Sequence, residues 1–188
     1  LSTNTRKRVA QQGWEDEVAR EVESLLKSGQ GEEAIRLLHE RHERLPGSNL
    51  YLLEAQALRI LGRENDACET ILSGLRGATS LQQVEMLLLL SLIEESRDRL
   101  RRALDAAERA FVLTRRSPDV LLKLRALITR LRLYRKLHME KEQDRLRARA
   151  IRSISTKVLK LLKDHPILFQ EVAAELGSRS QDILRAAI

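Results

Sequence analysis

The sequence predicts an all-α fold, and three observations support that prediction. Leu, Ala, Arg and Glu dominate the 188 residues, and only three prolines and eight glycines interrupt them. Apolar residues recur at steps of three and four, which is the spacing of one face of an α-helix. Small residues also recur at long range, because Ala34 precedes Ala67 by 33 residues and Ala103 follows 36 residues later. A period of this length is typical of stacked pairs of helices.

The clearest unit is a hairpin of two amphipathic helices over residues 50–75. The small or apolar positions of its two helices are Ala55, Leu58, Leu61, Ala67, Ile71 and Leu75. Gly62 lies in the turn between them and suits the positive φ that often ends a helix, because glycine has no Cβ to clash. One hairpin is too small to bury its own apolar faces, so we expect the other segments to repeat it and to stack on it.

The segments before this hairpin are predicted to form a first pair of helices. Residues 1–13 are polar and show no apolar period, so they are predicted to form a tail. A helix is then expected over 14–28, with Trp14 at its start, and a second helix over 32–45. The sequence Pro-Gly-Ser-Asn at 46–49 predicts the turn that leads into the next helix.

A third pair of helices is predicted over 80–96 and 99–115. The helix over 80–96 is apolar nearly all round between Met86 and Ile93. Such a helix is usually covered by neighbours on all sides. The alternative is an exposed apolar face that forms a homo-oligomer or docks a partner.

The C-terminal part is predicted to hold a longer pair of helices, over 120–138 and 140–163, and two short helices over 167–176 and 181–187. The core positions expected on the 24-residue helix over 140–163 are Ile151, Ile154, Val158 and Leu161. A second stripe on the same helix is basic, turned away from the core by about 120°. This basic ridge consists of Arg145, Arg149, Arg152, Lys160 and Lys163.

Three copies of one pattern resemble the tetratricopeptide repeat family over about residues 15–117. The first copy has Gly29, Ala34, Leu38 and Pro46 at the family's spacing, and the second has Tyr51, Ala55, Leu58, Gly62, Ala67 and Ile71. The third keeps Ala103, Ala107 and Ala110. The chain departs from the pattern where Thr79 replaces the proline and where Asp98 replaces the glycine.

The resemblance implies a right-handed α-solenoid of tetratricopeptide-like helical hairpins. Its parts would be a polar tail (1–13), three helix pairs (14–117), an extended fourth pair with the basic ridge on its outside (118–165) and a C-terminal helical hairpin that caps the last pair (166–188). The family's function is protein–protein interaction. We therefore expect a scaffold or adaptor segment of a larger protein or assembly.

Solenoids of this family bind partners in the groove formed by the first helix of each pair. The positions that face this groove by resemblance are Glu23, Lys27, Asn49, Gln56, Arg59, Glu85 and Leu88. Three of them, Asn49, Gln56 and Arg59, are suited to bind the backbone of an extended peptide. The family's way of holding a terminal carboxylate needs a Lys and an Asn one turn apart, where this chain has Ala19 and Glu23, so that mode is not expected.

The charge of the chain is unevenly distributed. The net charge is +7, but residues 1–94 carry 11 Lys or Arg against 15 Asp or Glu, while residues 130–163 carry 12 against three. Three interpretations of the basic ridge are open, namely a solvated helix face without a partner, a surface for an acidic protein and a nucleic-acid-binding module over 130–188. Between the two partners, an acidic protein is preferred. The five aromatic residues are not interleaved with the ridge, which disfavours stacking on bases.

A second resemblance concerns the C-terminus, which is similar to a DNA-binding helix-turn-helix. Residues 172–177, Val-Ala-Ala-Glu-Leu-Gly, are followed by apolar residues at Ile183 and Ala186. The chain departs from that motif at Ser178, where an apolar residue usually follows the glycine. A cap that covers the last helix pair is the preferred interpretation.

The sequence shows no pattern of an enzyme, so neither a catalytic residue nor a cofactor is expected. His39 and His42 have a spacing that suits half of a metal site, but His138 and His165 lie far away, and no metal is expected. Cys68 is predicted to be a buried thiol. The remaining alternative is an accessory domain of an enzyme whose catalytic part lies outside this segment.

Two further expectations concern where the chain works. The longest apolar run has eight residues, far fewer than the roughly 20 that a membrane span needs. A cytoplasmic location is therefore expected. Because the sequence begins with Leu1, we also expect it to be part of a longer protein.

Overall fold

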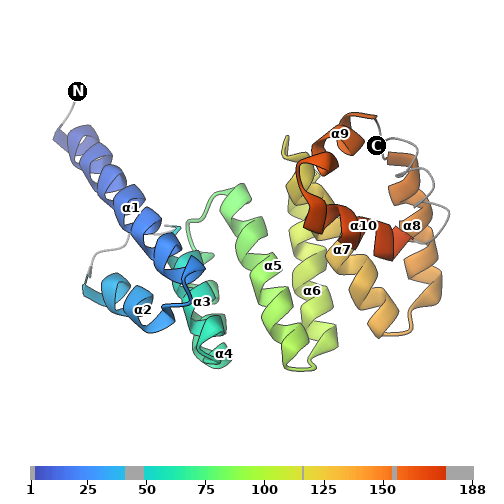
Figure 1. Cartoon of the computed structure of the whole chain (residues 1–188), viewed down its shortest axis with the longest axis horizontal. Helices are drawn as coiled ribbons and strands as arrows, with labels where there is room; N and C mark the ends of the chain where they lie inside the picture. The colour runs from blue at the N-terminus through green and yellow to red at the C-terminus, as the bar shows by residue number, and fades with distance from the viewer. Residues whose placement is uncertain (1–2, 41–48, 116, 154–155, 177–188) are drawn as a thin grey trace. The chain divides into compact units, whose positions relative to one another are not determined.

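The computed structural model describes residues 3–40, 49–115, 117–153 and 156–176, and it shows α-helices joined by short turns (Figure 1). Within these residues there is no strand, so the all-α prediction is confirmed for them. The helices are α1 (Thr3–Lys27), α2 (Gly31–Glu40), α3 (Leu50–Ile60), α4 (Glu64–Gly74), α5 (Ser80–Ser96), α6 (Leu100–Thr114), α7 (Val120–Lys136), α8 (Glu140–Ser153), α9 (Thr156–Lys163) and α10 (Pro166–Leu176).

The chain forms two compact units, Leu1–Ile93 and Glu94–Ile188. The first unit contains α1 to α4 and most of α5. The second contains the last residues of α5 and α6 to α10.

The same turn joins the two helices of each hairpin. Its central residue has a positive φ, which is 77° at Gly29, 72° at Gly62, 56° at Asp98 and 55° at His138. The residue after it donates its N–H to the carbonyl oxygen five positions back, at 2.8 or 2.9 Å. These bonds run from Gln30 to Leu25, from Arg63 to Leu58, from Arg99 to Glu94 and from Met139 to Tyr134. The pattern is a Schellman cap, which satisfies carbonyl groups at the helix end.

The residue five positions after each left-handed residue lies at the start of the next helix and is buried. In three hairpins it is an alanine with no exposed surface, at Ala34, Ala67 and Ala103. In the fourth it is Gln143, which is also buried, and its Nε2 has no hydrogen-bond partner in the described part of the chain. The chain therefore contains a repeated structural unit whose last copy departs from the others at a core position.

The first unit is held together by close packing of its hairpins. Helix α3 packs on α4 and α2, and α1 packs on α2 and α3. Val22, Leu50 and Ile71 are fully buried there. At Gly74 an added Cβ would lie 2.5 Å from the Tyr51 Cβ, so only glycine lets these two helices approach this closely.

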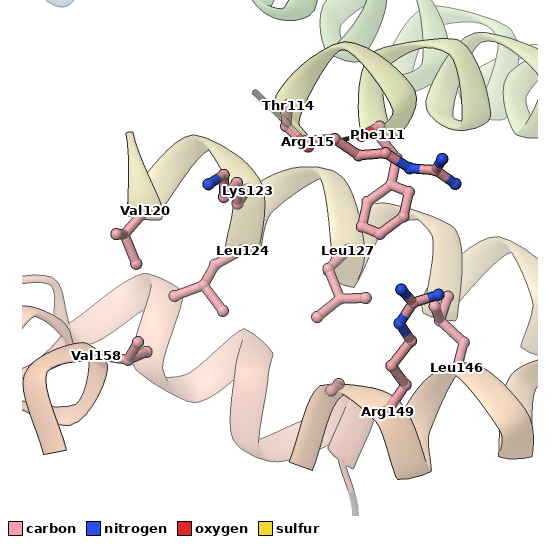
Figure 2. A pocket seen from close by; sticks show the side chains of 11 residues that line it. Phe111, Thr114, Arg115, Val120, Lys123, Leu124, Leu127, Leu146, Arg149 and Val158 are labelled. Atoms are coloured by element: carbon pink, nitrogen blue, oxygen red, sulfur yellow. Dashed lines mark hydrogen bonds between the residues drawn. The ribbon is translucent and has the colours of Figure 1, made fainter. Parts of the chain in front are cut away.

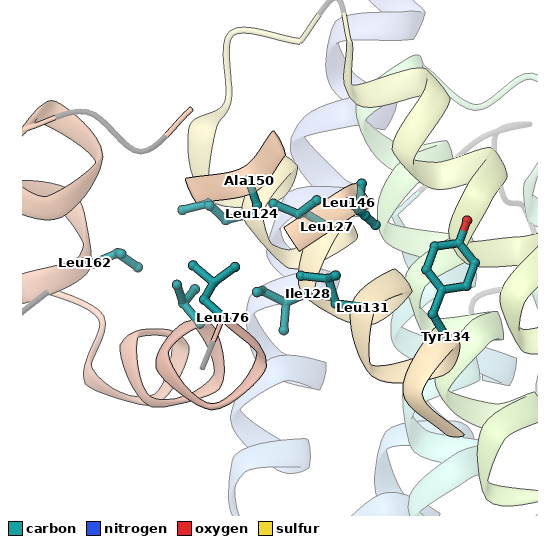
Figure 3. Packing of buried hydrophobic residues seen from close by; sticks show 10 residues of the cluster. Leu124, Leu127, Ile128, Leu131, Tyr134, Leu146, Ala150, Leu162 and Leu176 are labelled. Carbon is teal, nitrogen blue, oxygen red and sulfur yellow. The ribbon is translucent and has the colours of Figure 1, made fainter. Parts of the chain in front are cut away.

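The second unit has its core around α7 (Figure 3). The core side chains come from four helices and are Leu124, Leu127, Ile128, Leu131, Tyr134, Leu146, Ala150, Leu162, Val172 and Leu176. Helix α10 packs on α7, α8 and α9. It thus packs against both helices of the last hairpin. The expected second helix of the cap, over 181–187, lies outside the described residues.

Charged groups tie α7 to its neighbours in the second unit. The Glu95 carboxylate accepts hydrogen bonds from Arg132 Nε and Nη2 at 3.1 and 2.8 Å, and Lys136 Nζ lies 2.9 Å from it. Glu175 on α10 pairs with Arg135 Nη2 at 2.7 Å. Burial by itself would raise the pKa of Glu95. The hydrogen bonds and positive charges of Lys136 and Arg132 together outweigh this effect, so the pKa of Glu95 lies below its usual value. Burial keeps the pKa of Glu175 above its usual value despite Arg135.

Two helix boundaries differ from the sequence-based expectation. Helix α1 begins at Thr3, so residues 3–13 continue the helix that was predicted to start at Trp14. These residues include Arg, Lys, Ala and Gln, which favour a helix even without an apolar period. The predicted single helix over 140–163 is wrong, because α8 ends at Ser153 and α9 begins at Thr156.

The break changes which side chains form the core. On α8 the buried apolar residues among those described are Leu146 and Ala150, whereas the predicted core residue Ile151 is only half-buried. On α9 Leu162 is fully buried, while Leu161 and Val158 are half-buried. Two separate helices orient their buried faces independently. The core positions predicted for one continuous helix of 24 residues therefore do not match the buried face of either helix.

The left-handed turn predicts opposite effects for two Gly-to-Ala substitutions. Gly62→Ala should lower the free energy of unfolding by about 1–2 kcal/mol, because alanine in the left-handed region brings its Cβ against the following carbonyl oxygen. Gly13→Ala, inside α1 with no atom within 4 Å of the new Cβ, should raise it by up to about 1 kcal/mol. Urea unfolding of both variants measures the difference. Destabilisation by both substitutions to the same extent would contradict the turn's role.

The two buried carboxylates predict opposite pH dependences. The folded-state pKa of Glu95 is lowered, so its stabilisation is present above the unfolded value and is lost as the pH falls through the folded value. Glu95→Gln should therefore cost about 1–3 kcal/mol near pH 7 and much less in acid. The folded-state pKa of Glu175 is raised, so its ionisation costs stability as the pH rises, and Glu175→Gln should be tolerated best near pH 7. Urea unfolding of both variants near pH 7 and pH 4 measures how the loss in the free energy of unfolding caused by each substitution changes with pH. A loss that changes in the same direction for both variants would refute this assignment.

Candidate functional site

A cavity of about 470 Å³ lies in the first unit between α1, α3 and α5. Its lining residues are Ala19, Glu23, Leu26, Lys27, Asn49, Leu52, Leu53, Gln56 and Glu85. Five of these were predicted to face the groove, namely Glu23, Lys27, Asn49, Gln56 and Glu85. The structure therefore brings together residues that are up to 62 positions apart in the sequence. We call this cavity the groove.

The helical period places these residues on facing surfaces. On α1 the lining residues Ala19, Glu23 and Lys27 recur every four positions, so they lie along one face. On α3 the lining residues begin at Asn49 and return after seven positions at Gln56, which is two turns of helix. The packing of α1 on α3 brings these two faces together.

The groove combines polar groups with an apolar floor. Asn49 stands at the N-terminal cap of α3, but its side chain does not cap the helix, and its Oδ1 accepts a hydrogen bond from Gln82 Nε2 at 3.2 Å. The Gln56 side chain is half-buried and has no hydrogen-bond partner among the described residues. Leu26 and Leu52 are half-buried beside these amides. The arrangement can bind a peptide backbone through the amides and hold an apolar side chain on the leucines.

Two predicted groove residues lie elsewhere. Arg59 is exposed on α3 but does not line the groove. Leu88 was predicted to face the groove and is instead a core residue with 7% of its surface exposed. The reason is the burial of α5, whose residues 86–91 are all covered, so that its groove-facing surface ends at Glu85. The apolar part of α5 is thus buried as predicted, apart from Leu92, and gives little surface for a homo-oligomer.

The basic ridge is not one continuous stripe. Arg145 and Arg149 are exposed on α8, and Lys163 is exposed at the end of α9, beyond the break. The side chains of Arg152 and Lys160 lie outside the described residues. The ridge as a stripe along one helix is therefore wrong, because α8 and α9 are separate.

The aromatic side chains of the second unit are engaged in packing. Arg130 lies over the rings of Phe111 and Tyr134, at 4.6 and 5.3 Å from their centroids. The Tyr134 hydroxyl donates to Glu108 Oε1 at 2.6 Å, and burial raises the pKa of Tyr134. Because Tyr134 is 5% exposed, it offers no face on which a base could stack.

The candidate metal and thiol residues have structural surroundings. His39 Nε2 lies 2.9 Å from Oε1 of the buried Glu54, and His42 lies outside the described residues. Among the residues that the structure describes, no three His, Cys, Asp or Glu side chains come together as metal ligands would. Cys68 is buried, as predicted. In the helix-turn-helix comparison, the matching residues Gly177, Ile183 and Ala186 and the departure at Ser178 all lie outside the described residues.

Neither comparison with known proteins nor a search for membrane-spanning helices assigns this chain to a class of protein. In the described ranges, no helix has the length and apolar character needed to cross a membrane. Comparison with protein-family models, with curated proteins and with solved structures found no match. The geometry of the sites is therefore the basis for any functional conclusion.

Sequence reasoning missed a second cavity, of about 700 Å³, which lies in the second unit (Figure 2). It is formed by α6, α7, α8 and α9. Its apolar lining could not be told from ordinary core residues in the sequence, because a helical period marks which face is inward and not whether the inward space is filled. The one available signal was the presence of cations next to apolar positions, at Lys123 and Arg149.

Proposed function

We propose that the chain is a protein-interaction module of the tetratricopeptide type, a right-handed solenoid that binds an extended segment of a partner protein in the groove. The observation that supports this proposal is the convergence of five predicted groove residues on one cavity. The repeated hairpin turn at Gly29, Gly62, Asp98 and His138 supports the repeat architecture. The proposal makes the chain a scaffold or adaptor within a larger cytoplasmic protein or assembly, without a catalytic role of its own.

The chemistry of the groove favours an extended peptide over a folded surface. An extended peptide presents unpaired N–H and C=O groups, and the amides of Asn49 and Gln56 can both donate and accept hydrogen bonds. A cavity of about 470 Å³ accommodates a few side chains rather than a whole domain face. The charged residues of the described lining are Glu23, Glu85 and Lys27, which gives one more negative than positive group. A basic side chain in the peptide therefore fits the groove best.

The groove proposal predicts a loss of peptide affinity when its amides are removed. Peptides selected from a random display library on the full chain serve as ligands, and fluorescence polarisation measures their Kd. Replacing both Asn49 and Gln56 by Ala should weaken binding by about 30-fold, since each lost hydrogen bond costs about 1 kcal/mol. The control replaces Arg59 and Glu69 by Ala, two exposed residues that do not line the groove.

Two results would contradict this prediction. One is an equal Kd for the wild-type chain and the Asn49/Gln56 variant, which would place the peptide elsewhere. The other is an equal loss in the Arg59/Glu69 control, which would show that general surface changes are responsible. Circular dichroism of both variants establishes that the helical fold is retained.

Nucleic-acid binding by residues 130–188 is the alternative, and the exposed Arg145 and Arg149 are the observation in its favour. We expect no binding of a random DNA duplex by the full chain near physiological salt, because the ridge is interrupted and Tyr134 is buried. Fluorescence anisotropy at increasing salt measures this. Submicromolar binding with a steep salt dependence, reduced by Arg145→Glu and Arg149→Glu, would establish the alternative.

A further inference from the structure

The cavity of the second unit, about 700 Å³ in volume, is lined almost entirely by apolar side chains and cations. The apolar residues are Phe111, Val120, Leu124, Leu127, Leu146, Ala150 and Val158. The other lining residues are Thr114 and three cations, Arg115, Lys123 and Arg149, and there is no carboxylate among them. Figure 2 shows Leu124 and Leu127 pointing into the space from α7, with Arg149 directed toward it from α8.

The three cations around this cavity are not among the paired cations of the same unit. Arg130, Arg132, Arg135, Lys136 and Arg147 each pair with a carboxylate. In contrast, Arg115, Lys123 and Arg149 form no ion pair with any residue in the described ranges. Three positive side chains therefore line an apolar space, and the lining contains no negative group to balance them.

We propose that this cavity binds a long-chain carboxylate, with the alkyl chain between α7, α8 and α9 and the carboxylate at the cations. Burial of the alkyl chain against the leucines supplies the affinity. Charge complementarity orients the ligand, because the charged residues of the lining are Arg115, Lys123 and Arg149 and the lining holds no carboxylate. The volume lies within the range of small-molecule sites, and spaces between the helices of a bundle are common places for them.

The first test is a series of ligands measured by isothermal titration calorimetry on the full chain, all below their micelle-forming concentrations. Affinity should rise about fifteenfold with each added pair of methylenes from octanoate to decanoate to dodecanoate. Decanoate should bind more tightly than decanol, and decyltrimethylammonium should bind least. The absence of decanoate binding, or equal binding of the cationic amphiphile, would overturn the proposal.

The second test separates the cations of the cavity from other cations on the same helices. Replacing both Lys123 and Arg149 by Gln should weaken decanoate binding by about tenfold and leave decanol binding unchanged. The matched control replaces Arg125 on α7 and Arg145 on α8, which are exposed and do not line the cavity, and it should bind decanoate as the wild-type chain does. Equal Kd values for decanoate in both variants would overturn the role of the cations.

The third test fills the space and compares another occupant. Val120→Trp, at the half-buried first residue of α7, should abolish binding of both decanoate and decanol while the far-ultraviolet circular dichroism is unchanged. Unchanged binding would place the ligand outside the cavity. An acidic amphipathic helical peptide should not displace decanoate. Displacement by that peptide at lower concentration than by dodecanoate would overturn the proposal and assign the cavity to a protein partner.

Discussion

The fold depends on one recurring constraint, which is how a helix ends and the chain reverses. At Gly29, Gly62, Asp98 and His138 one residue in the left-handed region allows the next N–H to reach back five residues to the end of the helix. The helix stops there, its last carbonyl groups are satisfied, and the following helix begins within a few residues. The same spacing puts a buried side chain at the start of each second helix. At the groove, the packing of α1 on α3 decides which faces meet.

This constraint explains how much of the fold could be predicted. Glycines at Gly29 and Gly62 are visible in a sequence because glycine is the usual residue at positive φ. Asp98 and His138 adopt the same conformation, but they belong to the minority of other residues that tolerate it, so the fourth copy of the turn could not be recognised. The break between α8 and α9 was missed for a related reason. Ser153 and Thr156 beside the break are weak helix formers, but no proline or glycine lies within 140–163, so the sequence did not mark a helix end there.

The groove was predictable to the extent that the resemblance to tetratricopeptide repeats indicates which positions of a first helix face inward. Glu23, Lys27, Asn49 and Gln56 were named on that basis, and they line the cavity. Leu88 was misplaced because its exposure depends on what covers α5, which no local pattern contains. The cavity of the second unit was missed for the opposite reason: its leucines have the spacing of a packed core, and the unfilled space among them is a property of four helices together.

The pairing of cations changes how the charge of the C-terminal half is interpreted. Residues 130–163 carry nine more basic than acidic residues, which suggests a broad positive surface for a partner. In the folded chain five of these cations pair with carboxylates, and three of those carboxylates, Glu95, Glu108 and Glu175, lie outside this segment. Three of the nine excess charges of this segment are thus balanced in space by carboxylates from elsewhere in the unit. Charge that is balanced internally contributes to packing and not to long-range attraction. Among the cations without an ion pair in the described ranges, Arg115, Lys123 and Arg149 lie beside the cavity, where the fold places no carboxylate in the lining.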